Sequence, residues 1–154
     1  MTLSRTLLIG LAAGGSAFLL LAAFGFQHLG GLPPCQLCLW QRWPHAAAVV
    51  IGILALLLPG RALPLAGLVA ALVTAGIGIY HTGVERGIWD GPSSCSSGGV
   101  TGLDSDELFD QIMSAPLVRC DEVLWQMFGL SMASWNALAA LGLAALWLMA
   151  ARAR

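Results

Sequence analysis

The stretch LLIGLAAGGSAFLLLAAFGF occupies residues 7–26 and contains no charged side chain. As an α-helix this run would be about 30 Å long, which matches the hydrocarbon core of a bilayer. The rest of the chain is similar in character, since 58% of its 154 residues are hydrophobic, 10% are charged and the mean hydropathy is +0.81. This composition excludes an ordinary water-soluble domain and predicts an integral membrane protein.

Three further apolar runs follow, over residues 43–58, 62–80 and 130–151. Pro59 and Gly60 interrupt the chain between the second and third runs and predict a tight turn. We expect α-helices, because a lipid-exposed backbone must satisfy its own hydrogen-bonding groups and runs of this length do not resemble barrel strands. The predicted fold is therefore an all-α, four-helix transmembrane bundle that forms a single domain over residues 1–154. Its outer loops are expected at about 27–42 and 81–129.

The charged residues are divided unevenly between the two ends of this predicted bundle. The end with both termini and the short turn carries only arginines as charged residues, namely Arg5, Arg61, Arg152 and Arg154. An excess of arginine is typical of the cytoplasmic side, so both termini are expected there. All eight acidic residues and all four cysteines lie toward the opposite end. An even number of cysteines on that side fits an oxidising compartment, where disulfides persist.

The second outer loop contains a segment with a helical pattern. Asp104 and Glu107 resemble a capping box, and an apolar stripe follows at Leu108, Phe109, Ile112 and Met113. The pattern predicts a short amphipathic helix that lies on the membrane or covers the mouth of the bundle. The preceding stretch 91–99 is rich in serine and glycine, so Cys95 within it is expected to be accessible.

The cysteines offer redox chemistry as well as structural cross-links. Cys35 and Cys38 form a CxxC unit, and a thiol near the start of a helix can have a lowered pKa that favours thiol exchange. As a static cross-link this small ring would contribute only about 2 kcal/mol, whereas a Cys95–Cys120 bridge would contribute about 3.5 kcal/mol. We therefore expect the first pair to be redox-active, while the second could be redox-active or structural. A single CxxC without a histidine at ligand spacing predicts no metal site.

Arg42 and His81 are the polar residues that could act beside the dithiol. Arg42 is expected near the amino end of the second helix, where a cation gains nothing from the helix dipole and requires an anionic neighbour. A thiolate at Cys38 or the charge on a reduced quinone would supply one, and the alternative is an arginine that reaches toward lipid phosphates. His81 ends the third run on the same side and could bond a quinone carbonyl or face headgroups.

Four sequence motifs in order resemble the DsbB family of bacterial inner-membrane, disulfide-forming oxidoreductases. The segment PCQLCLWQR at 34–42 resembles the first-loop motif of the family, and Tyr80-His81 resembles the end of its third helix. Cys95 and Cys120 fall where the second cysteine pair is expected, and residues 120–136 resemble the passage into the fourth helix. The resemblance covers essentially the whole chain.

The resemblance implies a sequence of thiol exchanges. A reduced periplasmic thioredoxin-fold protein of the DsbA type would attack the Cys95–Cys120 disulfide and join transiently to Cys95. Cys120 would pass electrons to Cys35, and Cys38 would remain as a thiolate. The cysteine-bearing loops would therefore lie in the periplasm and the protein in the bacterial inner membrane.

For the electron acceptor, the resemblance implies a membrane quinone, either ubiquinone or menaquinone. Cys38 would contact the quinone, Arg42 would stabilise the negative charge and His81 would assist. Three alternatives remain open from the residues alone, and a metal-binding membrane protein is the weakest of them. A non-enzymatic membrane subunit would keep two structural disulfides that are indifferent to quinone. An enzyme of the vitamin K epoxide reductase type would carry its CxxC late in the chain, whereas here it follows the first span.

Overall fold

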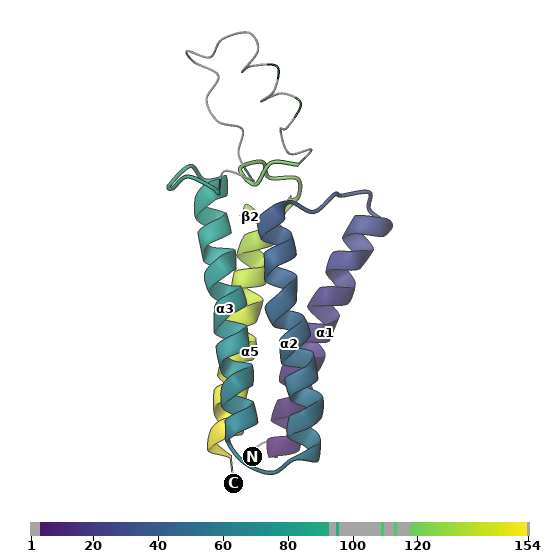
Figure 1. Cartoon of the computed structure of the whole chain (residues 1–154), viewed down its shortest axis with the longest axis vertical. Helices are drawn as coiled ribbons and strands as arrows, with labels where there is room; N and C mark the ends of the chain where they lie inside the picture. Colours follow the sequence, from purple (N-terminus) through teal and green to yellow (C-terminus); the bar gives the residue numbers. More distant parts are fainter. Residues whose placement is uncertain (1–3, 93–94, 96–108, 110–112, 114–117, 154) are drawn as a thin grey trace.

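The computed structural model describes residues 4–92, 95, 109, 113 and 118–153. Four long helices stand side by side as a bundle: α1 (Arg5–His28), α2 (Gln36–Leu57), α3 (Ala62–Glu85) and α5 (Met132–Arg152) (Figure 1). Each is long and apolar enough to cross a membrane. The prediction of a helical, four-span membrane protein is confirmed.

A small hairpin that the sequence did not predict precedes α5. Its strands are β1 (Gln126–Met127) and β2 (Leu130–Ser131), paired antiparallel. The turn residues Phe128 and Gly129 both have positive φ angles, of 53° and 74°. This backbone twist is the one that a two-residue hairpin turn requires. Ser131 then caps α5, because its side chain accepts a hydrogen bond from the Ser134 amide.

α2 begins at Gln36, well before the apolar run that starts at Trp43. The cause is local, since Cys35 is the N-cap residue and its sulfur accepts a hydrogen bond from the Cys38 amide at 3.3 Å. Arg42 consequently lies in the second turn of α2 rather than at its amino end. Because the helix dipole acts mainly on the first turn, other contacts must explain the position of this arginine.

α3 continues to Glu85, past the end of its apolar run at Tyr80. His81 is therefore fixed on a helix instead of opening a loop. The amphipathic helix predicted after Asp104 falls almost wholly outside the described residues.

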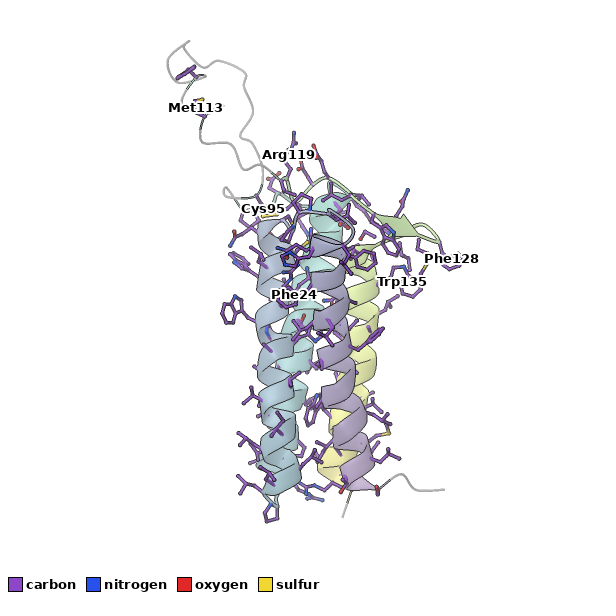
Figure 2. All side chains as sticks on the ribbon, turned by 90° about the vertical axis from the view of Figure 1, so that its right-hand side faces the viewer. Phe24, Cys95, Met113, Arg119, Phe128 and Trp135 are labelled. Atoms are coloured by element: carbon purple, nitrogen blue, oxygen red, sulfur yellow. A yellow bond between two sulfur atoms is a disulfide. The ribbon has the colours of Figure 1, made fainter. Side chains whose placement is uncertain are left out.

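The half of the bundle that holds the chain ends is tightly packed. Trp147 is completely buried there, and a Cβ atom added at Gly67 would lie 2.5 Å from its ring. At the extreme end, Arg5 donates a hydrogen bond to the Gly60 carbonyl in the α2–α3 turn at 2.6 Å. Figure 1 shows both termini at this end, while Figure 2 places Cys95 at the other. The cysteines and a cavity that they line thus lie in the opposite half.

Candidate redox site

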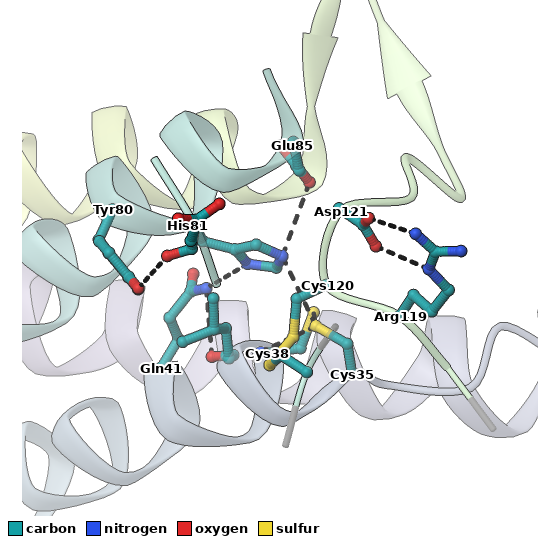
Figure 3. Close-up of a disulfide and its surroundings, with 12 residues drawn as sticks. Cys35, Cys38, Gln41, Tyr80, His81, Glu85, Arg119, Cys120 and Asp121 are labelled. Atoms are coloured by element: carbon teal, nitrogen blue, oxygen red, sulfur yellow. Dashed lines mark hydrogen bonds and ion pairs between the residues drawn. A yellow bond between two sulfur atoms is a disulfide. The ribbon is translucent and has the colours of Figure 1, made fainter. Parts of the chain in front are cut away.

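The dithiol is built where the start of α2 meets the end of α3. The sulfur atoms of Cys35 and Cys38 are 2.9 Å apart, and both residues are free thiols. His81 reaches across from α3, so that its Nε2 lies 3.5 Å from the Cys35 sulfur (Figure 3). The structure therefore brings together three of the residues that the sequence singled out, although His81 is far from the CxxC unit in the chain.

Cys35 is the sulfur that this environment favours as a thiolate. Hydrogen bonding from the Cys38 thiol lowers the pKa of Cys35 most; burial opposes this effect, and the hydrogen bond from His81 lowers the pKa further. The net result is a pKa well below the usual cysteine range of about 8–9. The position of Cys35 at the positive end of α2 acts in the same direction.

Hydrogen bonds from a neighbouring amide fix the proton position on His81. The Gln41 side-chain nitrogen donates to the Leu37 carbonyl at 3.3 Å and contacts His81 Nδ1 at 3.0 Å. Because the Leu37 carbonyl can only accept, the amide NH2 must face it, and His81 Nδ1 must then be an acceptor. The Asn136 amide supports this orientation by donating to Gln41 Oε1 at 2.7 Å. A neutral His81 ring therefore carries its proton on Nε2, which faces the Cys35 sulfur.

Glu85 lies one turn beyond His81 on α3 and completes this corner of the site. Its Oε1 is 3.8 Å from His81 Nε2, and its side chain is only 7% exposed. The carboxylate is thus close to a sulfur that gains and loses a proton. By sequence Glu85 is one of the eight acidic residues of this end, and its i+4 spacing from His81 is the signal that could have identified it.

The second cysteine pair forms a disulfide that packs against the dithiol. Cys95 and Cys120 are bonded to each other and both are completely buried. They belong to one hydrophobic cluster with Cys35, Leu37 and Val84. The expectation of an accessible Cys95 is therefore wrong in this structure, because the residue is packed over the ends of α2 and α3. As a consequence, the two cysteine pairs are neighbours.

An exposed ion pair borders the segment that carries Cys120. Arg119 donates two hydrogen bonds to the Asp121 carboxylate, at 3.0 and 2.5 Å (Figure 3). The guanidinium lowers the pKa of Asp121, and the carboxylate raises the pKa of Arg119. Such exposed pairs contribute little to stability, so we assign it the local role of orienting this short segment.

Arg42 is turned toward α1. Its Nη1 donates to Gln27 Oε1 at 2.7 Å, its Nη2 donates to the Ala23 carbonyl at 3.4 Å, and its guanidinium carbon lies 4.9 Å from the centre of the Phe24 ring. Its Nε–H is buried and has no hydrogen-bond partner among the described residues. The arginine therefore presents one unused donor beside the dithiol.

A cavity of about 440 Å³ adjoins all of these groups. Its polar rim includes Cys35, Cys38, Arg42, His81 and Glu85, and the rest of its wall is mainly apolar. The apolar wall comes from α1, α5 and the segment before α5, with Phe18, Phe26, Trp125 and Trp135 as its aromatic members. Figure 2 shows Trp135 at the edge of the bundle. The volume and lining suit an apolar ring with a few polar atoms.

The same corner also meets the first requirement of a metal site. The ligand atoms of Cys35, Cys38 and His81 all lie within 4.8 Å of one another. The sequence did not predict this group, because local spacing does not show that His81 approaches the CxxC unit. Three such ligands could hold a zinc ion with a fourth group, so metal analysis is a useful control for the thiol chemistry considered below.

Together, the fold and site define a helical membrane protein with a redox-active cysteine pair beside a buried disulfide. The family model described as disulfide bond formation protein DsbB matches residues 4–150, and the chain belongs to this family. It is 35% identical over 128 residues to disulfide bond formation protein B of Pasteurella multocida, covering 78% of this chain and 71% of the relative.

Two further relatives support the same assignment. Disulfide bond formation protein B of Polaromonas naphthalenivorans is 30% identical, with coverage of 96% of this chain and 92% of the relative. Disulfide bond formation protein B 2 of Pseudomonas aeruginosa is 33% identical, with coverage of 81% and 77%. No solved structure matches the chain. The protein is thus a multi-pass inner-membrane protein of disulfide bond formation.

Proposed function

We propose that this protein oxidises a DsbA-type thioredoxin-fold protein in the periplasm and passes the electrons to a membrane quinone. The observation that carries the proposal is the position of the Cys35/Cys38 dithiol. It packs against the Cys95–Cys120 disulfide on one side and lines an apolar cavity on the other. The disulfide could therefore react with a protein partner while the adjacent dithiol reduces a lipid-soluble acceptor.

The first stage is thiol–disulfide exchange with the partner. A partner thiolate attacks the Cys95 sulfur, and the Cys95–Cys120 bond breaks to release the Cys120 thiolate. The second partner thiol then displaces Cys95, which leaves the partner oxidised and this pair as two thiols. Because Cys95 and Cys120 are completely buried, the first attack requires their segment to move away from α2 and α3.

The second stage moves the electrons from one cysteine pair to the other. Cys120 attacks a Cys35–Cys38 disulfide at Cys35, Cys38 leaves as a thiolate, and Cys95 then resolves the mixed disulfide. The products are a Cys95–Cys120 disulfide and a Cys35/Cys38 dithiol, which is the pairing found in the structure. The short path within one buried cluster favours this exchange.

The third stage reoxidises the dithiol. Closing the Cys35–Cys38 disulfide releases two electrons and two protons, which a bound quinone accepts to become a quinol. The cavity fits such a molecule, because the unpartnered Arg42 Nε–H is a donor suited to a carbonyl oxygen. His81, with its proton on Nε2, and Glu85 lie where they can exchange protons with Cys35.

The membrane orientation belongs to the proposal as well. The end with both termini carries Arg5, Arg61 and Arg152, which favours the cytoplasm by the positive-inside rule. The cysteine end then faces the periplasm, where disulfides persist and a DsbA-type partner would be found.

The test is steady-state reduction of ubiquinone-1 or a short menaquinone by purified protein that is supplied with a reduced DsbA-type protein. We expect turnover in the wild type and its loss in Cys38→Ala, with both proteins equally helical by circular dichroism. Absence of turnover with both quinones in folded wild-type protein would refute the proposal. That result would favour a membrane subunit with a structural disulfide.

A further inference from the structure

His45 is a buried polar residue that the proposed reaction does not use. On α2, Cys38 is at position i, Arg42 at i+4 and His45 at i+7, so the three side chains share one face of the helix. All three line the same cavity. His45 is only 3% exposed and lies at greater depth along α2 than the dithiol.

The hydrogen-bond network that orients His81 also determines the proton position on His45. Gln41 presents its NH2 to the Leu37 carbonyl, so its Oε1 must accept from the Asn136 amide nitrogen. Asn136 consequently turns its Oδ1 toward His45 Nε2, at 3.0 Å. An amide oxygen can only accept, so His45 Nε2 must carry a proton and donate.

His45 is therefore a neutral acceptor at Nδ1. No carboxylate among the described residues pairs with it, and an unpaired imidazolium buried in an apolar bundle would be very unfavourable. With its one proton on Nε2, the neutral ring has a lone pair on Nδ1. That atom is buried and has no hydrogen-bond partner in the described part of the chain.

Two residues that line the cavity thus each carry a buried, unpartnered polar atom, and the two atoms are of opposite character. Arg42 Nε–H is a donor, and His45 Nδ1 is an acceptor. Each leaves a hydrogen bond unmade, which is unfavourable unless a ligand or water supplies the partner. A ligand that satisfies both must offer an acceptor to one and a donor to the other.

The two redox forms of a quinone differ in this property. The carbonyl oxygens of the oxidised form only accept, so they match Arg42 and leave His45 unsatisfied. The hydroxyl groups of the quinol both donate and accept, so they match both residues. We propose that His45 Nδ1 accepts a hydrogen bond from a quinol hydroxyl, which makes the cavity bind the reduced form of the quinone more tightly than the oxidised form. This inference rests on the proposed function, since it assumes that the cavity is a quinone site.

Preferential binding of the quinol has a consequence for the direction of electron flow. A site that stabilises the reduced form of an acceptor makes its reduction more favourable at that site by the difference in binding free energy. His45 would thereby draw electrons from the Cys35/Cys38 dithiol, at the expense of slower release of the product. It acts as a ligand to the product rather than as a group that exchanges protons with Cys35.

The experiment measures binding of both redox forms without turnover. The full-length protein carries Cys35→Ala and Cys38→Ala, and ubiquinone-1 and ubiquinol-1 are titrated anaerobically by isothermal titration calorimetry. In this background His45→Phe should weaken ubiquinol binding on the order of tenfold, the value of one lost hydrogen bond, and change ubiquinone binding less than about twofold. His28→Phe, at the exposed end of α1, is the matched control and should change neither.

Loss of affinity by the same factor for both forms, or for neither, would overturn the inference. If His45→Phe does not fold, ¹⁵N-histidine NMR of the unmutated His45 in the same background replaces it. Ubiquinol should then shift the unprotonated Nδ1 resonance and ubiquinone should not, and equal responses would refute the inference. Failure of the proposed function is distinguishable, because a protein with intact cysteines would then neither bind nor reduce either quinone.

Discussion

The hydrogen bond from His81 should lower the pKa of the Cys35 thiol by a measurable amount. His81→Phe keeps a ring of similar size but removes the Nε2–H that lies 3.5 Å from the Cys35 sulfur. A hydrogen bond to a charged group contributes about 1.5–3 kcal/mol, and one pKa unit corresponds to about 1.4 kcal/mol. The pKa of Cys35 should therefore rise by about 1–2 units in the variant.

The pKa of Cys35 rises in the variant because His81 favours the thiolate form of Cys35. In the wild type the hydrogen bond stabilises the thiolate, so Cys35 stays ionised down to a low pH. In the variant the thiol regains its proton at a higher pH, and between the two pKa values only the wild type is ionised. The Cys38 thiol remains in place, so the pKa of Cys35 should still lie below the ordinary cysteine range.

The assay is a pH titration of the ultraviolet thiolate absorbance in reduced protein. Cys95→Ala and Cys120→Ala provide the background, so that only the dithiol titrates. His28→Phe serves as the control, because His28 lies at the exposed end of α1. A midpoint that is the same in His81→Phe and in the control would refute the role of His81 in stabilising the thiolate.

Three further predictions concern packing, the arginine and metal binding. Gly67→Ala should destabilise the protein by about 1–3 kcal/mol, because the new methyl group would clash with the Trp147 ring. Gly76→Ala is the control and should have little effect, because no atom lies within 4 Å of the new methyl group. Both can be measured by reversible unfolding in mixed micelles. Equal effects would contradict this packing. Arg42→Met should weaken ubiquinone binding on the order of tenfold while Arg86→Met leaves it unchanged, and an unaltered affinity in Arg42→Met would exclude the arginine from the site. Elemental analysis of purified protein should find zinc far below one ion per chain, and a stoichiometric content would identify the Cys–Cys–His group as a metal site.

The sequence was sufficient to predict the architecture, because each span is a long apolar run and the breaks between them are marked by proline, glycine and charge. It was less informative about where the helices begin and end. Residues 36–42 and 81–85 lie outside the apolar runs, yet they are helical, because Cys35 caps α2 and Gln41 of α2 contacts His81 of α3. Local composition could not show these partners.

The sequence likewise predicts some residues of the site and not others. The CxxC motif identifies Cys35 and Cys38 from the sequence. Arg42 and His81 are candidates because they are polar residues at the ends of apolar runs on the same side. The sequence predicts no role for Gln41 and Asn136, since their roles depend on contacts between α2, α3 and α5 that no local pattern encodes. Conversely, the serine- and glycine-rich surroundings of Cys95 indicated exposure, and packing against the helix ends buries it instead.

If both cysteine pairs pass their electrons to one quinone site, each reduced chain should form a fixed number of quinols, and this number can be counted. Fully reduced protein is mixed anaerobically with excess ubiquinone-1, and the quinol formed in a single reaction is measured. We expect about two quinols per chain for the wild type and about one for the Cys95→Ala/Cys120→Ala variant, because each dithiol supplies two electrons. About one quinol per chain from the wild type would show that the Cys95/Cys120 pair is not connected to the dithiol, and no quinol at all would show that neither pair reduces a quinone.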